Sequence, residues 1–275
     1  MIARTAYGLA ERLPAPVRRA LRAGAGWLMS LPYRGRGRWC PVCGRESRCF
    51  APFGKVRRPE ARCVHCGALE RHRLIWLYFT HATDLFDARP KTMLHVAPEP
   101  CLGARIRERV GAGYLSADLR NPGAMVNFDI QAIPYPDATF DVIYCSHVLE
   151  HVADDRRAMR ELLRVLKPDG WAILLVPVMP GASFEDSSIV EPRDRLREYG
   201  DETHVRRYGR DYEERLREEG FHVRRSSASD VAGEAERHRM GLTAAAGDIY
   251  FCTRVPPATL LQEASGLRIL ADRIP

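Results

Sequence analysis

The feature that most constrains the fold is an alternation of short β-rich runs with amphipathic helical runs between about residues 92 and 254. This alternation predicts a parallel sheet, because the connection between two parallel strands has to cross back over the sheet, usually through a helix. The predicted strands are Thr92–Ala97, Tyr114–Leu119, Met125–Ile130, Asp141–Ser146, Trp171–Pro177, Phe221–Arg225 and Asp248–Arg254. The predicted helices are Leu102–Val110, Asp154–Leu166 and Gly209–Glu219, with a solvated helix face at Arg193–Glu198. We therefore predict an α/β fold with a seven-stranded, mostly parallel sheet, helices on both faces and the last strand at the sheet edge.

The N-terminal part follows a different pattern. Residues 1–38 are rich in arginine, with apolar residues at helical spacing that Pro14 and Pro16 interrupt. We expect two short amphipathic helices here, packed on the main domain. The alternative is an arm that contacts a membrane surface or a nucleic acid. Further along, Leu69–Phe86 is expected to form one helix with Leu74 on its inner side.

Charge is unevenly distributed along the 275 residues, whose net charge is +7. Residues 1–91 hold 18 Lys or Arg against 6 Asp or Glu, so the N-terminal third is strongly basic. A basic module suits an anionic partner, although only three of the 42 basic residues are lysine and the arginine count is itself a compositional bias. No apolar run approaches the roughly 20 residues of a membrane helix or the core of a secretory signal. We expect a cytoplasmic protein.

Four of the eight cysteines form two Cys-x-x-Cys pairs separated by nineteen residues. Each pair can present two sulfurs to one tetrahedral ion, and Gly44 and Gly67 permit the tight turn that follows each pair. The predicted ligands are Cys40, Cys43, Cys63 and Cys66. The spacing predicts a small zinc ribbon with a closed, structural Zn²⁺ site, and Cys49 and His65 lie outside the symmetric pattern.

Acidic side chains stand where two predicted strands end, at the edge of the sheet where such folds bind ligands. Asp118, followed by Leu119, can accept the two hydroxyls of a ribose. Asp129 can accept a hydrogen bond from the exocyclic amine of adenine, with Ile130 on the face of the ring. The fourth strand ends at Ser146. These residues predict a site for an adenosine-containing cofactor.

The segment from Asp129 to Val176 contains a His147-Val-Leu-Glu-His-Val run and a Leu166-Lys-Pro-Asp-Gly turn. With these motifs the chain resembles the class I S-adenosylmethionine-dependent methyltransferases over about residues 91–255. The resemblance implies a Rossmann-like seven-stranded sheet that binds S-adenosylmethionine, with the acids on ribose and adenine at the positions of Asp118 and Asp129. Asp169 stands where the family has a glycine.

The loop after the first strand departs from the family pattern. His95 stands where an acid is common, and Ala97 and Glu99 stand where glycines are common. Pro98 and Pro100 also remove two backbone donors. We expect His95, Ala97 and Glu99 to contact the cofactor, with Glu99 holding one of its positive groups.

The acceptor side is expected to hold the catalytic groups. His147, Glu150 and His151 fall at i, i+3 and i+4 and would share one helix face. His204 lies in the polar insertion 178–207, and such insertions form part of the substrate pocket in this family. These four residues could act without metal as a base or as positioning groups. Alternatively they could hold a second divalent ion that activates a substrate hydroxyl.

The expected organisation is a basic arm over 1–38, a zinc ribbon over 39–68, a methyltransferase domain over 69–255 and a tail over 256–275. The favoured function is O-methylation of a hydroxylated small molecule, a sugar or glycan, or a lipid-linked intermediate. The alternative is an RNA methyltransferase that binds rRNA or tRNA through the zinc ribbon, with Arg57, Arg58 and Arg62 on the phosphates. A third hypothesis is that the protein binds S-adenosylmethionine without catalysing methyl transfer.

Overall fold

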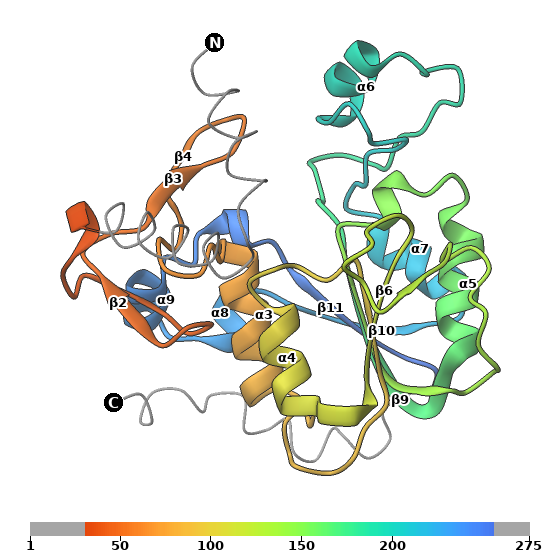
Figure 1. The fold of residues 1–275 in the computed structure, drawn as a ribbon. Coiled ribbons are helices and arrows are strands. Elements are labelled where there is room, and N and C mark those ends of the chain that lie inside the picture. Colours follow the sequence, from red (N-terminus) through yellow and green to blue (C-terminus); the bar gives the residue numbers. More distant parts are fainter. Residues whose placement is uncertain (1–30, 256–275) are drawn as a thin grey trace, which may run out of the picture.

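Seven strands form one sheet in the computed structural model, which describes residues 31–255 (Figure 1). The predicted N-terminal helices and the tail from residue 256 lie outside the described residues. The strand order is β10-β11-β9-β8-β5-β6-β7, and β11 runs antiparallel to both of its neighbours. The strands are β5 (Met93–Val96), β6 (Tyr114–Asp118), β7 (Val126–Asn127), β8 (Phe140–Ser146), β9 (Leu166–Leu175), β10 (His222–Ser226) and β11 (Ile249–Thr253). The predicted mostly parallel sheet is confirmed.

Three strand predictions need correction. The last strand, β11, is not at the sheet edge: it inserts between β9 and β10, where all five of its residues are buried. The third strand is only Val126–Asn127, because the chain then turns at Asp129. The fifth strand begins at Leu166, and its pairing with β8 is irregular near Gly170, where an added Cβ would lie 2.6 Å from the Asp141 carbonyl oxygen.

Helices cover both faces of the sheet (Figure 1). Helices α3 (Glu70–His81) and α4 (Gly103–Val110) lie on one side, and α5 (Asp155–Val165) and α7 (Tyr212–Glu218) on the other. Helix α3 ends five residues before the predicted Phe86, because Ala82 caps it and a turn then carries Leu85 into the core. The expected helix face at 193–198 lies in α6 (Pro192–Tyr199). Two short helices, α8 (Ala228–Val231) and α9 (Glu234–Met240), were not predicted.

Two small hairpins precede the sheet. Strands β1 (Arg38–Cys40) and β2 (Arg45–Ser47) form one, and β3 (Ala51–Phe53) and β4 (Arg58–Arg62) form the other. Short single turns of 3-10 helix complete the elements: η1 (Leu31–Tyr33), η2 (Gly111–Gly113), η3 (Leu149–His151) and η4 (Ala244–Ala246). Within residues 31–255 no helix is long and apolar enough to cross a membrane.

The buried guanidinium of Arg73 in α3 links the β3–β4 hairpin to the end of α9 through hydrogen bonds. It donates to the carbonyls of Ala61 and Ala68 at 3.0 and 2.9 Å, and to those of Met240 and Gly241 at 2.6 and 3.1 Å. Its cation also lies 4.1 Å from the centroid of the Phe50 ring. One charged side chain therefore satisfies four carbonyls that come from segments far apart in the sequence.

Candidate functional site

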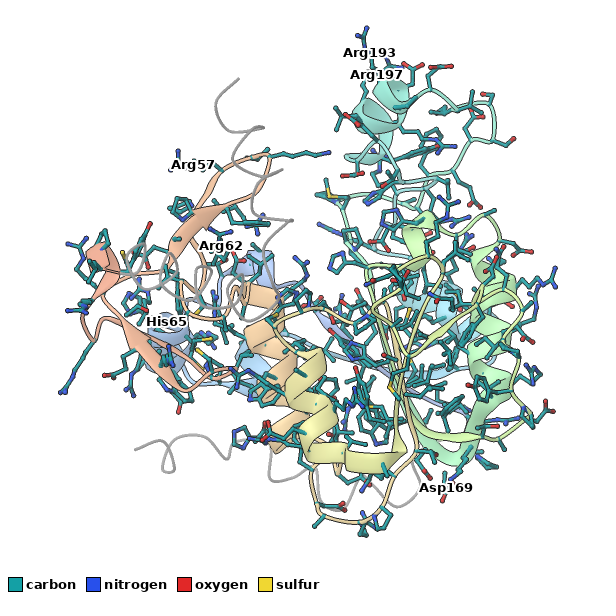
Figure 2. All side chains as sticks on the ribbon, viewed as in Figure 1. Arg57, Arg62, His65, Asp169, Arg193 and Arg197 are labelled. Atoms are coloured by element: carbon teal, nitrogen blue, oxygen red, sulfur yellow. The ribbon has the colours of Figure 1, made fainter. Side chains whose placement is uncertain are left out.

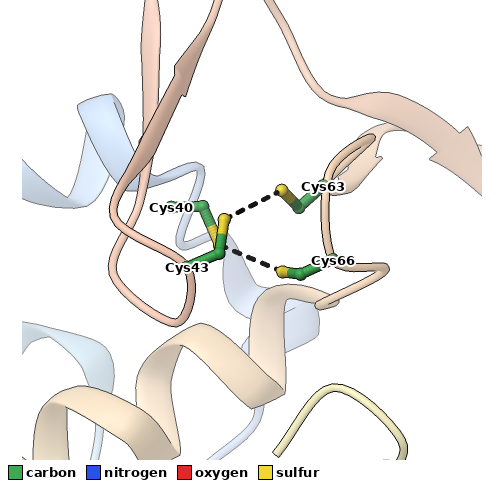
Figure 3. Close-up of side chains that lie close together, drawn as sticks. All are labelled: Cys40, Cys43, Cys63 and Cys66. Carbon is green, nitrogen blue, oxygen red and sulfur yellow. Dashed lines mark hydrogen bonds between the residues drawn. The ribbon is translucent and has the colours of Figure 1, made fainter. Parts of the chain in front are cut away.

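The four predicted cysteine ligands come together at the junction of the hairpins and α3 (Figure 3). The Sγ atoms of Cys40 and Cys66 are 3.7 Å apart, and those of Cys43 and Cys63 are 3.8 Å apart. A tetrahedral ion with metal–sulfur bonds of about 2.3 Å has sulfur–sulfur edges of about 3.8 Å. The cluster therefore has the donor set and the spacing that Zn²⁺ requires.

The turns that carry these sulfurs form as predicted. Gly44 and Gly67 adopt φ angles of 68° and 78°, in the left-handed region that glycine favours, and each donates its amide to the first cysteine of its pair. His65 and Cys49 stay outside the cluster; the His65 ring is instead 3.2 Å from the Glu46 carbonyl. The symmetric four-cysteine set is the better ligand prediction.

A pocket of about 460 Å³ opens at the carboxyl ends of β5, β6 and β8, within the roughly 300–1,000 Å³ of small-molecule sites. It is lined by Val96, Ala97, Ala117, Asp118, Leu119, Phe128, Asp129, Ile130, Gln131, His147, Val148, His151, Val152 and Ala153. Five of the eight residues predicted to bind the cofactor line it, namely Ala97, Asp118, Leu119, Asp129 and Ile130. Two of the predicted acceptor-side histidines line the same pocket.

The two acids of the pocket are held by local backbone. Oδ1 of Asp118 accepts the amides of Arg120 and Asn121, both at 2.8 Å, while Oδ2 has no partner among residues 31–255. Oδ2 is therefore available to ribose hydroxyls. Asp129 accepts the backbone amide of Gln131 at 2.8 Å and its side-chain amide at 2.9 Å. Sequence reasoning missed Gln131, whose amide can exchange places with an adenine amine on Asp129.

The other three predicted cofactor residues do not line this pocket. His95 is fully buried; its Nδ1 is 2.9 Å from the Tyr114 hydroxyl and its Nε2 is 3.0 Å from Glu99 Oε2. The Tyr144 hydroxyl donates to Glu99 Oε1 at 2.9 Å. His95 is thus a support for Glu99. Ser146 is also buried, and its Oγ has no partner among the described residues.

The Glu99 carboxylate is anionic in this setting. Burial disfavours its charge, but the hydrogen bond from His95 and the neighbouring histidines lower its pKa to about 2. The loop after β5 thus carries a charged carboxylate four residues after His95. At Ala97 the φ of 49° keeps the left-handed turn that a glycine would form without strain.

The predicted helix face at residues 147–151 is wrong in its local structure. His147 has a φ of 56°, Leu149–His151 is a single 3-10 turn, and α5 begins only at Asp155. The cluster nevertheless assembles. His147 Nδ1 lies 3.2 Å from Glu150 Oε1, and the rings of His151 and His204 are 4.8 Å apart. One ligand atom each of Glu150, His151 and His204 lies within 4.8 Å of the others.

In His151 and His204, Nδ1 is hydrogen-bonded within the protein, which leaves Nε2 of each ring for a ligand. Nδ1 of His204 lies 3.2 Å from the Tyr199 carbonyl, so it carries the proton and Nε2 holds the lone pair. His151 Nδ1 lies 3.1 Å from Thr203 Oγ1, and that hydroxyl donates to Asp201 at 2.8 Å. Burial lowers the pKa of His204 below its ordinary value of 6.5, so its imidazole is neutral at pH 7.

The insertion that carries His204 is anchored at both sides of the site. Arg206, which sequence reasoning missed, is buried and donates to the Leu149 carbonyl at 2.8 Å and to the Glu185 carboxylate at 2.8 Å. On the other side, Lys55 in the β3–β4 turn forms a 2.9 Å ion pair with Asp201. The β3–β4 hairpin thus contacts the insertion on the acceptor side through one ion pair. Only the run of charges in the insertion hinted at this in the sequence.

Comparison with known proteins bears on the same segment. Residues 107–174 match a family model described as a methyltransferase domain. An uncharacterized methyltransferase of Bacillus subtilis, YcgJ, is 38% identical over 28% of this chain and 28% of its own length. A malonyl-[acyl-carrier protein] O-methyltransferase of Halorhodospira halophila is 32% identical over 44% of this chain and 37% of its own length. The chain therefore spans about a third of the length of these relatives.

Among solved structures, an S-adenosylmethionine dependent methyltransferase from Mesorhizobium loti is 15% identical, with a TM-score of 0.45, over 65% of this chain and 97% of that one. Independently of that likeness, six strands of the sheet run in one direction, and the antiparallel β11 lies between β9 and the edge strand β10. Residues 107–174 of this chain are therefore similar to a methyltransferase domain, and the pocket and its acids lie in and beside this segment.

Proposed function

We propose that this protein transfers the methyl group of S-adenosylmethionine to a hydroxyl of a small molecule, a glycan or a lipid-linked intermediate. One observation carries the proposal: His151 lines the pocket and belongs to the cluster with Glu150 and His204, and His147 lines the same pocket and contacts Glu150. Two of the curated relatives carry names of an O-methyltransferase and a C-methyltransferase, so the choice of oxygen rests on this cluster.

Residues of the pocket, of the loop after β5 and of the neighbouring cluster would each contact one part of the cofactor or acceptor. Asp118 Oδ2 would accept the ribose hydroxyls, and Asp129 the adenine amine, with the buried Ile130 against the ring. The Glu99 carboxylate would attract the ammonium or the sulfonium. S-adenosylmethionine supplies, when bound, a methyl group activated by its sulfonium. His204, neutral and with Nε2 free to accept, would remove the proton of the acceptor hydroxyl.

The four cysteines would hold one Zn²⁺ in a closed, structural site. Thiolate ligands at all four corners leave no position for substrate, so this ion would take no part in the chemistry. Its role would be to fold residues 39–68, a segment whose short hairpins bury few large side chains of their own.

The proposal is tested by methyl transfer from tritiated S-adenosylmethionine into a host lysate, fractionated afterwards into RNA, protein, lipid and small-molecule pools. We expect label in the lipid or small-molecule pool with the wild type. Asp169→Ala is the control and should give the same label, because Asp169 is exposed and does not line the pocket (Figure 2). We expect none with Asp118→Ala. Ribonuclease-sensitive label in the RNA pool would reverse the choice of substrate. Binding of S-adenosylmethionine without label in any pool would support the hypothesis that the protein binds the cofactor without catalysis.

The pH profile of transfer into the labelled pool tests the base. Because burial lowers the pKa of His204 below 6.5, the rate should be flat above pH 7 and fall in acid as the imidazole is protonated. His204→Gln should lower kcat by about 100-fold or more. It should also abolish the acidic limb, while KM for S-adenosylmethionine stays unchanged. A variant that retains the full wild-type rate and profile would remove His204 from this role.

Metal analysis separates the two chemistries left open for the cluster. The metal-free account expects one zinc per chain in the wild type and in Glu150→Gln alike, and a rate that added Mg²⁺ or Mn²⁺ does not change. The Glu150 side chain is 1% exposed and its Oε2 has no partner among the described residues, which is the feature that favours an ion there. A second ion that Glu150→Gln removes, together with activity, would establish the metal-dependent alternative.

RNA methylation is the second candidate, favoured by the contact of the basic hairpins with the acceptor side through Lys55. The structure reduces the number of predicted arginines that are free to bind phosphates. Arg58 forms two hydrogen bonds with the buried Glu70, at 3.0 and 3.2 Å, and so has a structural partner. Arg57 and Arg62 are exposed on the β3–β4 hairpin and labelled in Figure 2. Binding to RNA would then depend on these two and fall steeply with salt.

A further inference from the structure

The loop after β5 offers few donors to a negative group. Pro98 and Pro100 have no amide hydrogen, and the amides of Ala97, Leu102 and Gly103 already donate to the carbonyls of Ala117 and Glu99. The prominent charged group of the loop is the Glu99 carboxylate. S-adenosylmethionine carries a carboxylate on its methionine moiety, and an anion of this kind is bound by amides or cations. Only the amides of Glu99 and Cys101 remain without a backbone acceptor in this loop, so a cation on a neighbouring element could supply the remaining contacts.

The first turn of α3 lies against this loop. His72 Nδ1 is 3.2 Å from Cys101 Sγ, and His72 Nε2 is 3.9 Å from Glu99 Oε1. Arg71 precedes it, half-buried, and its charge acts on both Cys101 and Tyr144. The Nε of Arg71 is buried without a partner, and within residues 31–255 its guanidinium makes no hydrogen bond or ion pair. A buried guanidinium nitrogen normally has a hydrogen-bond partner.

His72 presents a second unpaired donor at the same place. The Leu69 amide donates to His72 Nδ1 at 3.1 Å, so in the neutral ring the proton is on Nε2. Burial lowers the pKa of His72 to about 4, which keeps the ring neutral at pH 7. Nε2 is buried and has no hydrogen-bond partner among the described residues, and 6% of the residue is exposed.

We propose that Arg71 and His72 bind the carboxylate of the cofactor's methionine moiety, in place of the backbone donors that the loop lacks. The assignment rests on the proposed use of S-adenosylmethionine. It pairs the zwitterion with complementary charges, the ammonium with Glu99 and the carboxylate with Arg71. Arg71 follows Cys66 by five residues, so the cysteine cluster fixes where α3 begins and where this cation lies.

The test compares three ligands by calorimetric titration of the full, zinc-loaded protein. S-adenosylmethionine carries a carboxylate, an ammonium and a sulfonium. Decarboxylated S-adenosylmethionine lacks only the carboxylate, and 5′-methylthioadenosine lacks all three charged groups. Arg71→Gln should weaken binding of S-adenosylmethionine by about tenfold or more, the loss of one charge-assisted contact. It should leave Kd for the other two ligands unchanged. Arg71→Lys should recover part of the loss, and Arg193→Ala, an exposed arginine on α6, should bind all three like the wild type (Figure 2).

His72→Gln serves as a second variant and should show the same selective loss for S-adenosylmethionine. If Arg71→Gln binds S-adenosylmethionine as tightly as the wild type, or loses all three ligands equally while folded by near-ultraviolet circular dichroism, the assignment is overturned. The proposed cofactor then survives. If the wild type binds none of the three, the proposed function fails and the assignment fails with it.

Discussion

Replacing Cys63 with serine, or removing zinc with a chelator, is expected to unfold the hairpins and to lower the free energy of unfolding by more than about 5 kcal/mol. Structural zinc contributes about 10–16 kcal/mol of apparent binding energy to small folded modules. The hairpins here have strands of only three to five residues. Urea unfolding followed by the fluorescence of Trp39, which adjoins Cys40 in β1, measures the effect.

Cys49→Ser is the matched control, since Cys49 lies in the same module but outside the sulfur cluster. It should keep one zinc per chain and the wild-type unfolding curve. The loss in Cys63→Ser should extend to cofactor binding, because the cluster positions α3, whose Arg73 joins the hairpins to the segment after α9. A Cys63→Ser protein with the same metal content and midpoint as Cys49→Ser would contradict the structural role of the ion.

The sheet was predictable because its strands carry a local signal, a run of buried apolar residues bounded by turns. The position of β11 was not, since its sequence is as apolar as that of any inner strand and the prediction relied on its place near the chain end. Its insertion beside β9 is a long-range pairing that no local pattern encodes. The helices α8 and α9 were missed because segments of four and seven residues carry little periodic signal. The seven-residue α7 was predicted only as part of the longer run Gly209–Glu219.

The sequence could place Asp118 and Asp129 in the pocket because each stands where a predicted strand ends. The helical spacing of His147, Glu150 and His151 predicted a helix that does not form, because the backbone at His147 has a positive φ. The Glu150 side chain nevertheless contacts the His147 ring. Sequence reasoning could not find Arg71, because its significance depends on the absence of a partner, which only the packed structure reveals.

Asp118→Ala is expected to weaken binding of S-adenosylmethionine by about 100-fold. The carboxylate would accept two ribose hydroxyls, and two charge-assisted hydrogen bonds at about 1.5 kcal/mol each amount to about 3 kcal/mol. The fold should tolerate the change, because Asp118 lies at the end of β6 and its Oδ1 supports only the turn at Arg120 and Asn121. Asp118→Asn, which keeps that acceptor, should retain the turn and lose most of the affinity.

The most direct measurement is a calorimetric titration of S-adenosylmethionine into the wild type, Asp118→Ala and Asp169→Ala. The account predicts one cofactor per chain with the same Kd for the wild type and Asp169→Ala, and binding about 100-fold weaker for Asp118→Ala. No binding to the wild type, or equal affinity in all three proteins, would contradict the claim that this pocket binds S-adenosylmethionine.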